Sequence, residues 1–179
     1  ANNLFYAADG TIVYFTAALG VVYDKEAHSQ RFFTGHDDDV KCLTMSTGRN
    51  LCASGQVGKY PYVCVWDPAT CEEKKRLKHP AVRGVAAVGF CRDAKLLASV
   101  GMDNNHTIFV WDWRAGKCMH EVKGHTDVPP KVYGIAFDPF GPDATAFMSY
   151  GVNHIKWWSK PTGAKTYTEE SGKFAPAAK

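Results

Sequence analysis

Three of the seven histidines recur at nearly equal intervals, each in a short polar stretch. They are His36, His79 and His125, 43 and 46 residues apart. Histidine is the usual general acid or base of enzymes, but a catalytic residue has no reason to appear once per repeat. We therefore interpret all three as members of buried hydrogen-bond networks that fix a repeated unit.

Two other sets of side chains have the chemistry of metal ligands. Asp37-Asp38-Asp39 could hold Ca²⁺, but the alternating ligand pattern of a calcium loop is missing, so a solvated loop with a capping Asp is favoured. The cysteines lack the tight clustering of a zinc site. We expect buried, reduced thiols of a cytosolic protein. The six are Cys42, Cys52, Cys64, Cys71, Cys91 and Cys118.

The elements that position these residues are revealed by a tryptophan repeat. Segments 62–66, 108–111 and 155–158 end in Trp66, Trp111 and Trp158, at intervals of 45 and 47 residues. A Gly-His or Lys-His step precedes each Trp by about thirty residues. This period, with its His opening and Trp closing, is typical of WD-repeat β-propeller blades. We expect the three tryptophans in the blade cores, with Tyr23 in the equivalent position of a fourth unit.

In WD repeats the loop His bonds an Asp in a later turn, and the network extends to the strand Trp. Asp103 is predicted to serve His79 in this way. The unit of His36 has Gln56 and no Asp in that region, and the unit of His125 has Asn153. The networks of those two units are therefore predicted to be absent or rewired.

Between these markers the chain alternates short apolar segments with turn residues, and helical periodicity is absent. Strands are predicted at 4–7, 12–15, 19–23, 30–33, 40–46, 51–54, 62–66, 72–77, 85–90, 96–100, 107–113, 117–122, 132–137, 146–150, 155–158 and 164–168. This indicates an all-β chain of about four four-stranded blades. The units are a divergent blade at 1–34, WD blades at 35–78, 79–124 and 125–168, and a flexible tail at 169–179.

Four blades are fewer than WD-type propellers usually need to close a ring, and an open stack leaves two apolar faces uncovered. We expect part of a larger propeller, as a fragment or as the ordered part of a longer chain. A closed four-bladed ring is the alternative. The start Ala1-Asn2-Asn3, without an initiator Met or an apolar signal segment, also indicates a piece of a longer protein.

Two groups of residues are candidates for binding a partner. Lys74, Lys75, Arg76 and Lys78 lie on a predicted outer strand, where they protect an edge or attract an acidic partner. Trp113 and Trp157 stand beside core tryptophans and are predicted to point to the opposite face of their strands. They either pack beneath the next blade or serve as exposed binding anchors.

The composition sets limits on function. The chain has 179 residues, 45% of them hydrophobic, and a formal net charge of +3, which is too weak to indicate nucleic-acid binding. No apolar run approaches eighteen residues, so no transmembrane helix is expected. No phosphate loop, Ser/His/Asp arrangement or carboxylate pair stands out. We expect no cofactor and no enzyme active site.

Three segments are more specific than generic WD repeats. They are 19–24 followed by 30–40, 53–59 followed by 63–67, and 151–159. They resemble the propeller of the echinoderm microtubule-associated protein-like family, and the resemblance covers roughly residues 4–160. The first segment is the most specific, because generic WD repeats do not share it. The match places no catalytic residues.

The resemblance implies a non-enzymatic scaffold. In that family two joined propellers form one compact module that binds tubulin, and some members lie on microtubules of the cytoplasm, spindle or cilium. The expected partners are tubulin, microtubules or axonemal proteins, together with the rest of the propeller, at the cytoskeleton and in a ciliary axoneme. The family's basic coiled-coil region has no counterpart here.

Two alternatives remain open from the sequence. The chain could be a generic WD-repeat adaptor in another complex, such as a ubiquitin-ligase substrate receptor or a transport complex, because fold does not determine function. An enzyme that uses the central channel of the propeller is a weaker alternative. Nothing in the sequence supplies convergent ionisable residues at non-repeating positions.

Overall fold

The computed structural model of the chain describes residues 3–81, 83–125, 132–140 and 145–173. Its regular structure consists of sixteen β-strands. The first eight are β1 (Leu4–Tyr6), β2 (Ile12–Thr16), β3 (Leu19–Asp24), β4 (Ser29–Phe33), β5 (Val40–Met45), β6 (Cys52–Gly58), β7 (Tyr62–Trp66) and β8 (Glu73–Lys78). The others are β9 (Arg83–Phe90), β10 (Leu96–Gly101), β11 (Ile108–Asp112), β12 (Lys117–Val122), β13 (Val132–Phe137), β14 (Phe147–Gly151), β15 (His154–Ser159) and β16 (Thr168–Ser171).

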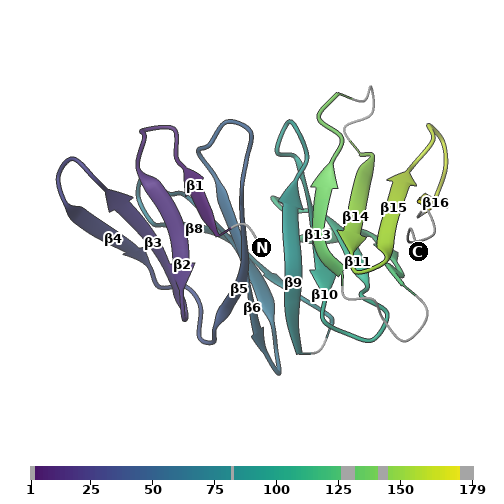
Figure 1. The fold of residues 1–179 in the computed structure, drawn as a ribbon, viewed down its shortest axis with the longest axis horizontal. Helices are drawn as coiled ribbons and strands as arrows, with labels where there is room; N and C mark the ends of the chain where they lie inside the picture. Colours follow the sequence, from purple (N-terminus) through teal and green to yellow (C-terminus); the bar gives the residue numbers. More distant parts are fainter. Residues whose placement is uncertain (1–2, 82, 126–131, 141–144, 174–179) are drawn as a thin grey trace, which may run out of the picture.

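Each group of four consecutive strands forms an antiparallel sheet, so the chain contains four blades. The blades follow one another in chain order from the purple to the yellow side of the molecule (Figure 1). Blades 2 and 3 are also joined by a short ladder between β6 and β9, where Val57 pairs with Gly84 and Gly58 with Arg83. The outermost strands β4, β8, β12 and β16 are mostly exposed.

The hydrophobic core is divided among the three joints between blades. Because side chains alternate across a strand, each blade has one face toward the preceding blade and one toward the next. Trp66 of blade 2 packs with Val13 and Val22 of blade 1. Trp111 packs against blade 2 in the same manner, and Trp158 against blade 3. Each Trp therefore faces the preceding blade, and its burial holds two blades together.

The end faces of the stack do not cover one another. On blade 1, Leu4, Tyr6 and Phe32 are 60%, 49% and 47% exposed. On the opposite end, Trp157 of blade 4 is 48% exposed. The closed four-bladed ring is therefore not formed, and the blades make an open part of a propeller.

The structure shifts some of the predicted boundaries. The last strand was expected at 164–168 but lies at Thr168–Ser171, where it pairs with β15. Residues 169–171 of the predicted tail thus belong to blade 4, whereas residues 174–179 lie outside the described part of the chain. No helix in the described ranges is long and apolar enough to cross a membrane.

Candidate functional site

In blade 2 a network is present in rewired form, with a serine at its centre and Gln56 in the place of an Asp. Ser54 Oγ lies 2.7 Å from His36 Nε2 and accepts a hydrogen bond from Trp66 Nε1 at 3.0 Å. On the other side of the ring, His36 Nδ1 lies 2.8 Å from Gln56 Oε1, and the Gln56 amide donates to Asp37 at 2.6 Å. The His36 Nδ1–H therefore donates to Gln56, and the Ser54 hydroxyl donates to Nε2.

Blade 3 contains the same arrangement with the opposite tautomer. Ser99 Oγ accepts from Trp111 Nε1 at 2.8 Å and lies 3.0 Å from His79 Nε2. His79 Nδ1 accepts the backbone N–H of Ala81 at 3.3 Å. The proton of a neutral His79 is therefore on Nε2, which donates to Ser99.

Asp103 does not make the bond predicted for it. Its carboxylate accepts the Thr107 hydroxyl at 2.7 Å and the backbone N–H groups of Thr107 and Asn105 at 3.1 and 3.2 Å. These bonds close the turn between β10 and β11, because a short Asx side chain reaches the backbone two to four residues on. Asp103 acts on His79 only through its charge, which raises the pKa of that imidazole against the larger effect of burial.

In blade 4 the histidine of the network is His154 and not His125. Ser149 Oγ accepts from Trp158 Nε1 at 2.9 Å and lies 2.9 Å from His154 Nε2. Asn153, with a φ of 48°, closes the tight turn that places His154 beside Ser149. The His125 ring packs edge-on against His154, with 5.8 Å between ring centroids. The prediction for His125 is wrong for the bond to Ser149, because the turn between β14 and β15 places the His154 imidazole there.

The three serines are the functional residues that the sequence interpretation missed. Ser54 and Ser99 each precede their Trp by twelve residues, and Ser149 precedes Trp158 by nine. The sequence pattern that could have identified them is a serine in the second strand of each of the three WD blades.

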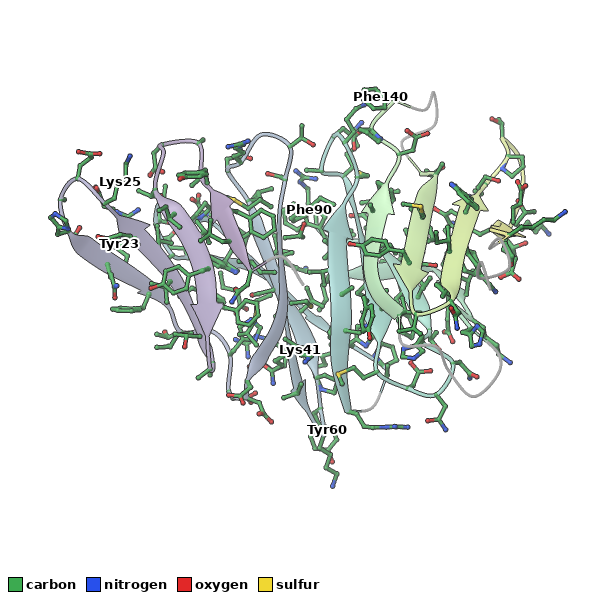
Figure 2. All side chains as sticks on the ribbon, in the orientation of Figure 1. Tyr23, Lys25, Lys41, Tyr60, Phe90 and Phe140 are labelled. Carbon is green, nitrogen blue, oxygen red and sulfur yellow. The ribbon has the colours of Figure 1, made fainter. Side chains whose placement is uncertain are left out.

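Blade 1 departs from the pattern at both positions. In the strand register Tyr14 occupies the place of the serine and Tyr23 that of the tryptophan. Tyr23 is only partly buried, and its hydroxyl lies 3.2 Å from His28 Nδ1 at the surface. Figure 2 shows Tyr23 near the free edge of the blade. No preceding blade covers the face of the sheet that carries Tyr23 in this chain, so the core role predicted for Tyr23 stays a prediction.

The buried imidazoles are held neutral. Burial lowers the pKa of His79 to about 4. Burial also lowers the pKa of His154 to about 4, helped by the positive charge of Lys156. For His36 the effect of burial outweighs the bond to Gln56, and the pKa again falls. These histidines serve as uncharged hydrogen-bonding groups at physiological pH.

Acid should therefore weaken the stack. The unfolded chain binds a proton at His79 below about pH 6.5, whereas the folded chain binds it only below about pH 4. Stability is full above pH 6.5 and falls by about 1.4 kcal/mol per pH unit below it for this histidine. We expect His79→Gln to reduce the protons taken up on unfolding at pH 5 by about one. Urea denaturation from pH 7 to 5 measures this, with exposed His28→Gln as the control; equal pH slopes in both variants would contradict it.

The basic residues of β8 are largely engaged within blade 2. Arg76 donates to Glu73 at 2.7 Å and to the Gly35 carbonyl at 2.7 Å, and its guanidinium lies 4.4 Å from the centre of the Tyr62 ring. Lys74 pairs with Glu72 at 3.2 Å and Asp67 at 3.7 Å. Lys75 and Lys78 extend from the same strand. The group that the sequence proposed for an acidic partner thus has much of its charge neutralised internally.

The two additional tryptophans have different positions. Trp113 lies beyond β11, two residues after Trp111, and packs in the same core cluster. Its Nε1 donates to the Ala94 carbonyl at 2.7 Å, and only 5% of the residue is exposed. The prediction of an opposite face is wrong for Trp113, because residues two apart in an extended chain share a face. Trp157 does point away from Trp158 and is half-exposed.

The titratable groups in the described ranges include no cluster of three or more His, Cys, Asp or Glu that could hold a metal ion. Cys42, Cys52, Cys64 and Cys91 are free and buried. Burial raises the pKa of the Cys42 thiol to about 12, so this sulfur remains a protonated core group. Cys71 is partly buried and Cys118 is exposed.

Four antiparallel blades, with a Trp–Ser–His network in three of them, define a WD-repeat β-propeller chain. The family described as "Echinoderm microtubule-associated protein first beta-propeller" matches residues 29–179. The chain belongs to this family.

Curated relatives agree with this assignment. The chain is 31% identical to the ciliary WD repeat-containing protein ctxp80 of Euplotoides octocarinatus, over 99% of the chain and 26% of the relative. It is 33% identical to echinoderm microtubule-associated protein-like 2 of Homo sapiens, over 90% of the chain and 26% of the relative. It is 32% identical to the 77 kDa echinoderm microtubule-associated protein of Strongylocentrotus purpuratus, over 96% of the chain and 25% of the relative. The chain thus spans about a quarter of the length of these relatives.

Proposed function

We propose that this chain is part of a non-enzymatic scaffold that docks onto microtubules, through tubulin or an axonemal protein. The observation that carries the proposal is the family match over residues 29–179, in relatives named for microtubule association. The geometry is compatible with a non-enzymatic scaffold, because the buried histidines of three blades form hydrogen bonds within their blades. A cytoskeletal location follows, and the ciliary relative favours a cilium or flagellum.

The propeller is completed, in this proposal, by further blades that cover its two end faces. Trp157 and Met148 lie on the open face of blade 4, in a groove of about 800 Å³ that Ala136 also lines. In the three internal joints the equivalent faces receive the Trp-bearing face of the next blade. A further blade of the same type fits this face.

The test is co-sedimentation with assembled microtubules across a salt series. The expected result is that the protein pellets with microtubules and not alone, with binding that weakens as salt screens surface charges. A protein that stays in the supernatant at every salt concentration would contradict tubulin docking. Pull-down followed by mass spectrometry then separates an axonemal partner from a generic adaptor, since ligase or transport subunits without tubulin would favour the adaptor.

A further inference from the structure

The turns at one end of blades 3 and 4 gather positive charge. In an antiparallel sheet alternate turns lie at the same end, so the β9–β10, β11–β12, β13–β14 and β15–β16 turns share one end of the molecule. Figure 1 shows the ends of β9 and β13, after which two of these turns begin, together at the top. Six cationic residues lie in or beside these turns, and we name them the basic rim. They are Arg92, Lys95, Arg114, Lys117, Lys160 and Lys165.

The carboxylates described in these turns are already engaged. Asp93, Asp112 and Asp138 accept backbone N–H bonds at 3.1, 3.0 and 2.8 Å, which close their own turns. Asp93 also forms an ion pair with Lys95 at 2.9 Å, so Lys95 contributes less free charge than the other five rim cations. At the same end of blades 1 and 2 the balance is reversed, with Lys25 and Arg49 against five acids. These are Asp9, Asp24, Glu26, Asp67 and Glu72. At this end of the molecule the excess of positive charge therefore lies on blades 3 and 4, although the net charge of the chain is only +3.

A groove of about 860 Å³ opens within this rim. Lys95 and Arg114 line it beside Asp112, and Leu96 supplies an apolar part of its wall. Thr145 of blade 4 lines it as well. The groove therefore lies at the joint between two blades and has room for a segment of extended chain.

The arginine in the groove is held in place. The Arg114 guanidinium lies 4.3 Å from the centre of the Trp113 ring, and its Nη1 donates to the Ala94 carbonyl at 2.8 Å. A guanidinium fixed in this manner keeps other N–H donors for a carboxylate and loses little entropy on binding. Arg92 donates to the Pro139 carbonyl at 3.2 Å, which ties the β13–β14 turn to the rim. Phe140 in that turn is 90% exposed (Figure 2).

We propose that the basic rim and its groove bind an acidic, extended peptide segment of a partner protein. Carboxylates of the peptide contact Arg114 and the rim lysines, and an apolar side chain rests on Phe140. A nucleic acid fits less well, because Asp93 and Asp112 alternate with Lys95 and Arg114 along the groove and every nucleotide carries a phosphate. An extended peptide can place its carboxylates at the cations and neutral residues beside Asp93 and Asp112. The proposal rests on charge and shape alone, so it can succeed or fail independently of microtubule docking.

Fluorescence anisotropy with a labelled peptide of alternating Glu and Gly tests this. The rim variant is Lys95→Glu, Lys117→Glu and Lys165→Glu, all at exposed positions. The matched control is Lys41→Glu, Lys59→Glu and Lys123→Glu, which changes charge equally at the opposite end, where the turn of Tyr60 lies away from that of Phe140 (Figure 2). We expect the rim variant to raise the Kd at least tenfold and the control less than twofold, at about 50 mM salt.

Further arms make the result decisive. A Gln/Gly peptide should not bind, and unchanged circular dichroism should show that both variants remain folded; a Lys→Gln version of the rim variant replaces any that does not fold. Equal weakening in the rim and control variants would overturn the proposal, as would absence of saturable binding at low salt. Tighter binding of a labelled single-stranded oligonucleotide than of the Glu/Gly peptide would overturn it in favour of nucleic acid.

Discussion

Replacing Trp66 by alanine should lower the free energy of unfolding by about 3–5 kcal/mol, the cost of deleting a buried aromatic ring. The residue is fully buried at the joint of blades 1 and 2. Its ring stacks on Phe33, with centroids 4.7 Å apart. A side chain at Gly20 would approach the Trp66 ring to 2.9 Å, so blade 1 is shaped around this ring. Alanine leaves a cavity there and also removes the hydrogen bond to Ser54.

Trp157→Ala is the matched control for this prediction. It deletes the same type of side chain next to the core residue Trp158 of blade 4, but Trp157 is half-exposed on an end face. Urea denaturation followed by circular dichroism should show a small loss, about 1 kcal/mol or less, for the control. Similar losses for the two variants would contradict the assignment of Trp66 as the residue that joins two blades.

Ser99→Ala should destabilise the chain by about 2–4 kcal/mol, although it removes a single oxygen atom. The Ser99 hydroxyl oxygen accepts hydrogen bonds from Trp111 Nε1 at 2.8 Å and from His79 Nε2 at 3.0 Å. The exposed fraction of Ser99 is 0%. Its loss leaves two buried polar groups without a partner, at about 1–3 kcal/mol each. Thermal denaturation measures the effect, and we expect a fall in Tm of roughly 5–15 °C.

Ser29→Ala controls for the general effect of removing a hydroxyl, because Ser29 is exposed at the start of β4. A double variant adds a sharper test. When Ser99→Ala is combined with Trp111→Phe, the unpaired indole N–H is no longer present. The losses of stability in the two single variants should therefore sum to more than the loss in the double variant. Strict additivity would mean that Ser99 and Trp111 act independently, contrary to the network.

These networks also give the histidines, which are common catalytic residues, a structural role in the proposed scaffold. His36, His79 and His154 are neutral and bonded within their blades. What differs between blades is the surface: paired charge on β8, tyrosines on blade 1 and the basic rim on blades 3 and 4. A scaffold can thus repeat one internal design and present a different surface with each blade.

The blade architecture could be predicted from sequence because its signals are local. Alternating apolar residues, turn formers and a Trp every 45 to 47 residues mark the strands within a few positions. The prediction was weakest for the last strand, since the segment before Thr168 has turn residues and little alternation. The burial of Trp66, Trp111 and Trp158 followed from the same period and is confirmed.

The partners of individual side chains were decided only by the tertiary structure. His154 displaces His125 because the β14–β15 turn places its imidazole 2.9 Å from Ser149, a fact of turn geometry and not of spacing. Arg76 is engaged because strand register sets it beside Glu73 and above Tyr62. The basic rim combines charges from turns distant in sequence. The sequence by itself determined the repeat and its strands, because those depend on neighbours in the chain; the networks and surfaces depend on which blades meet.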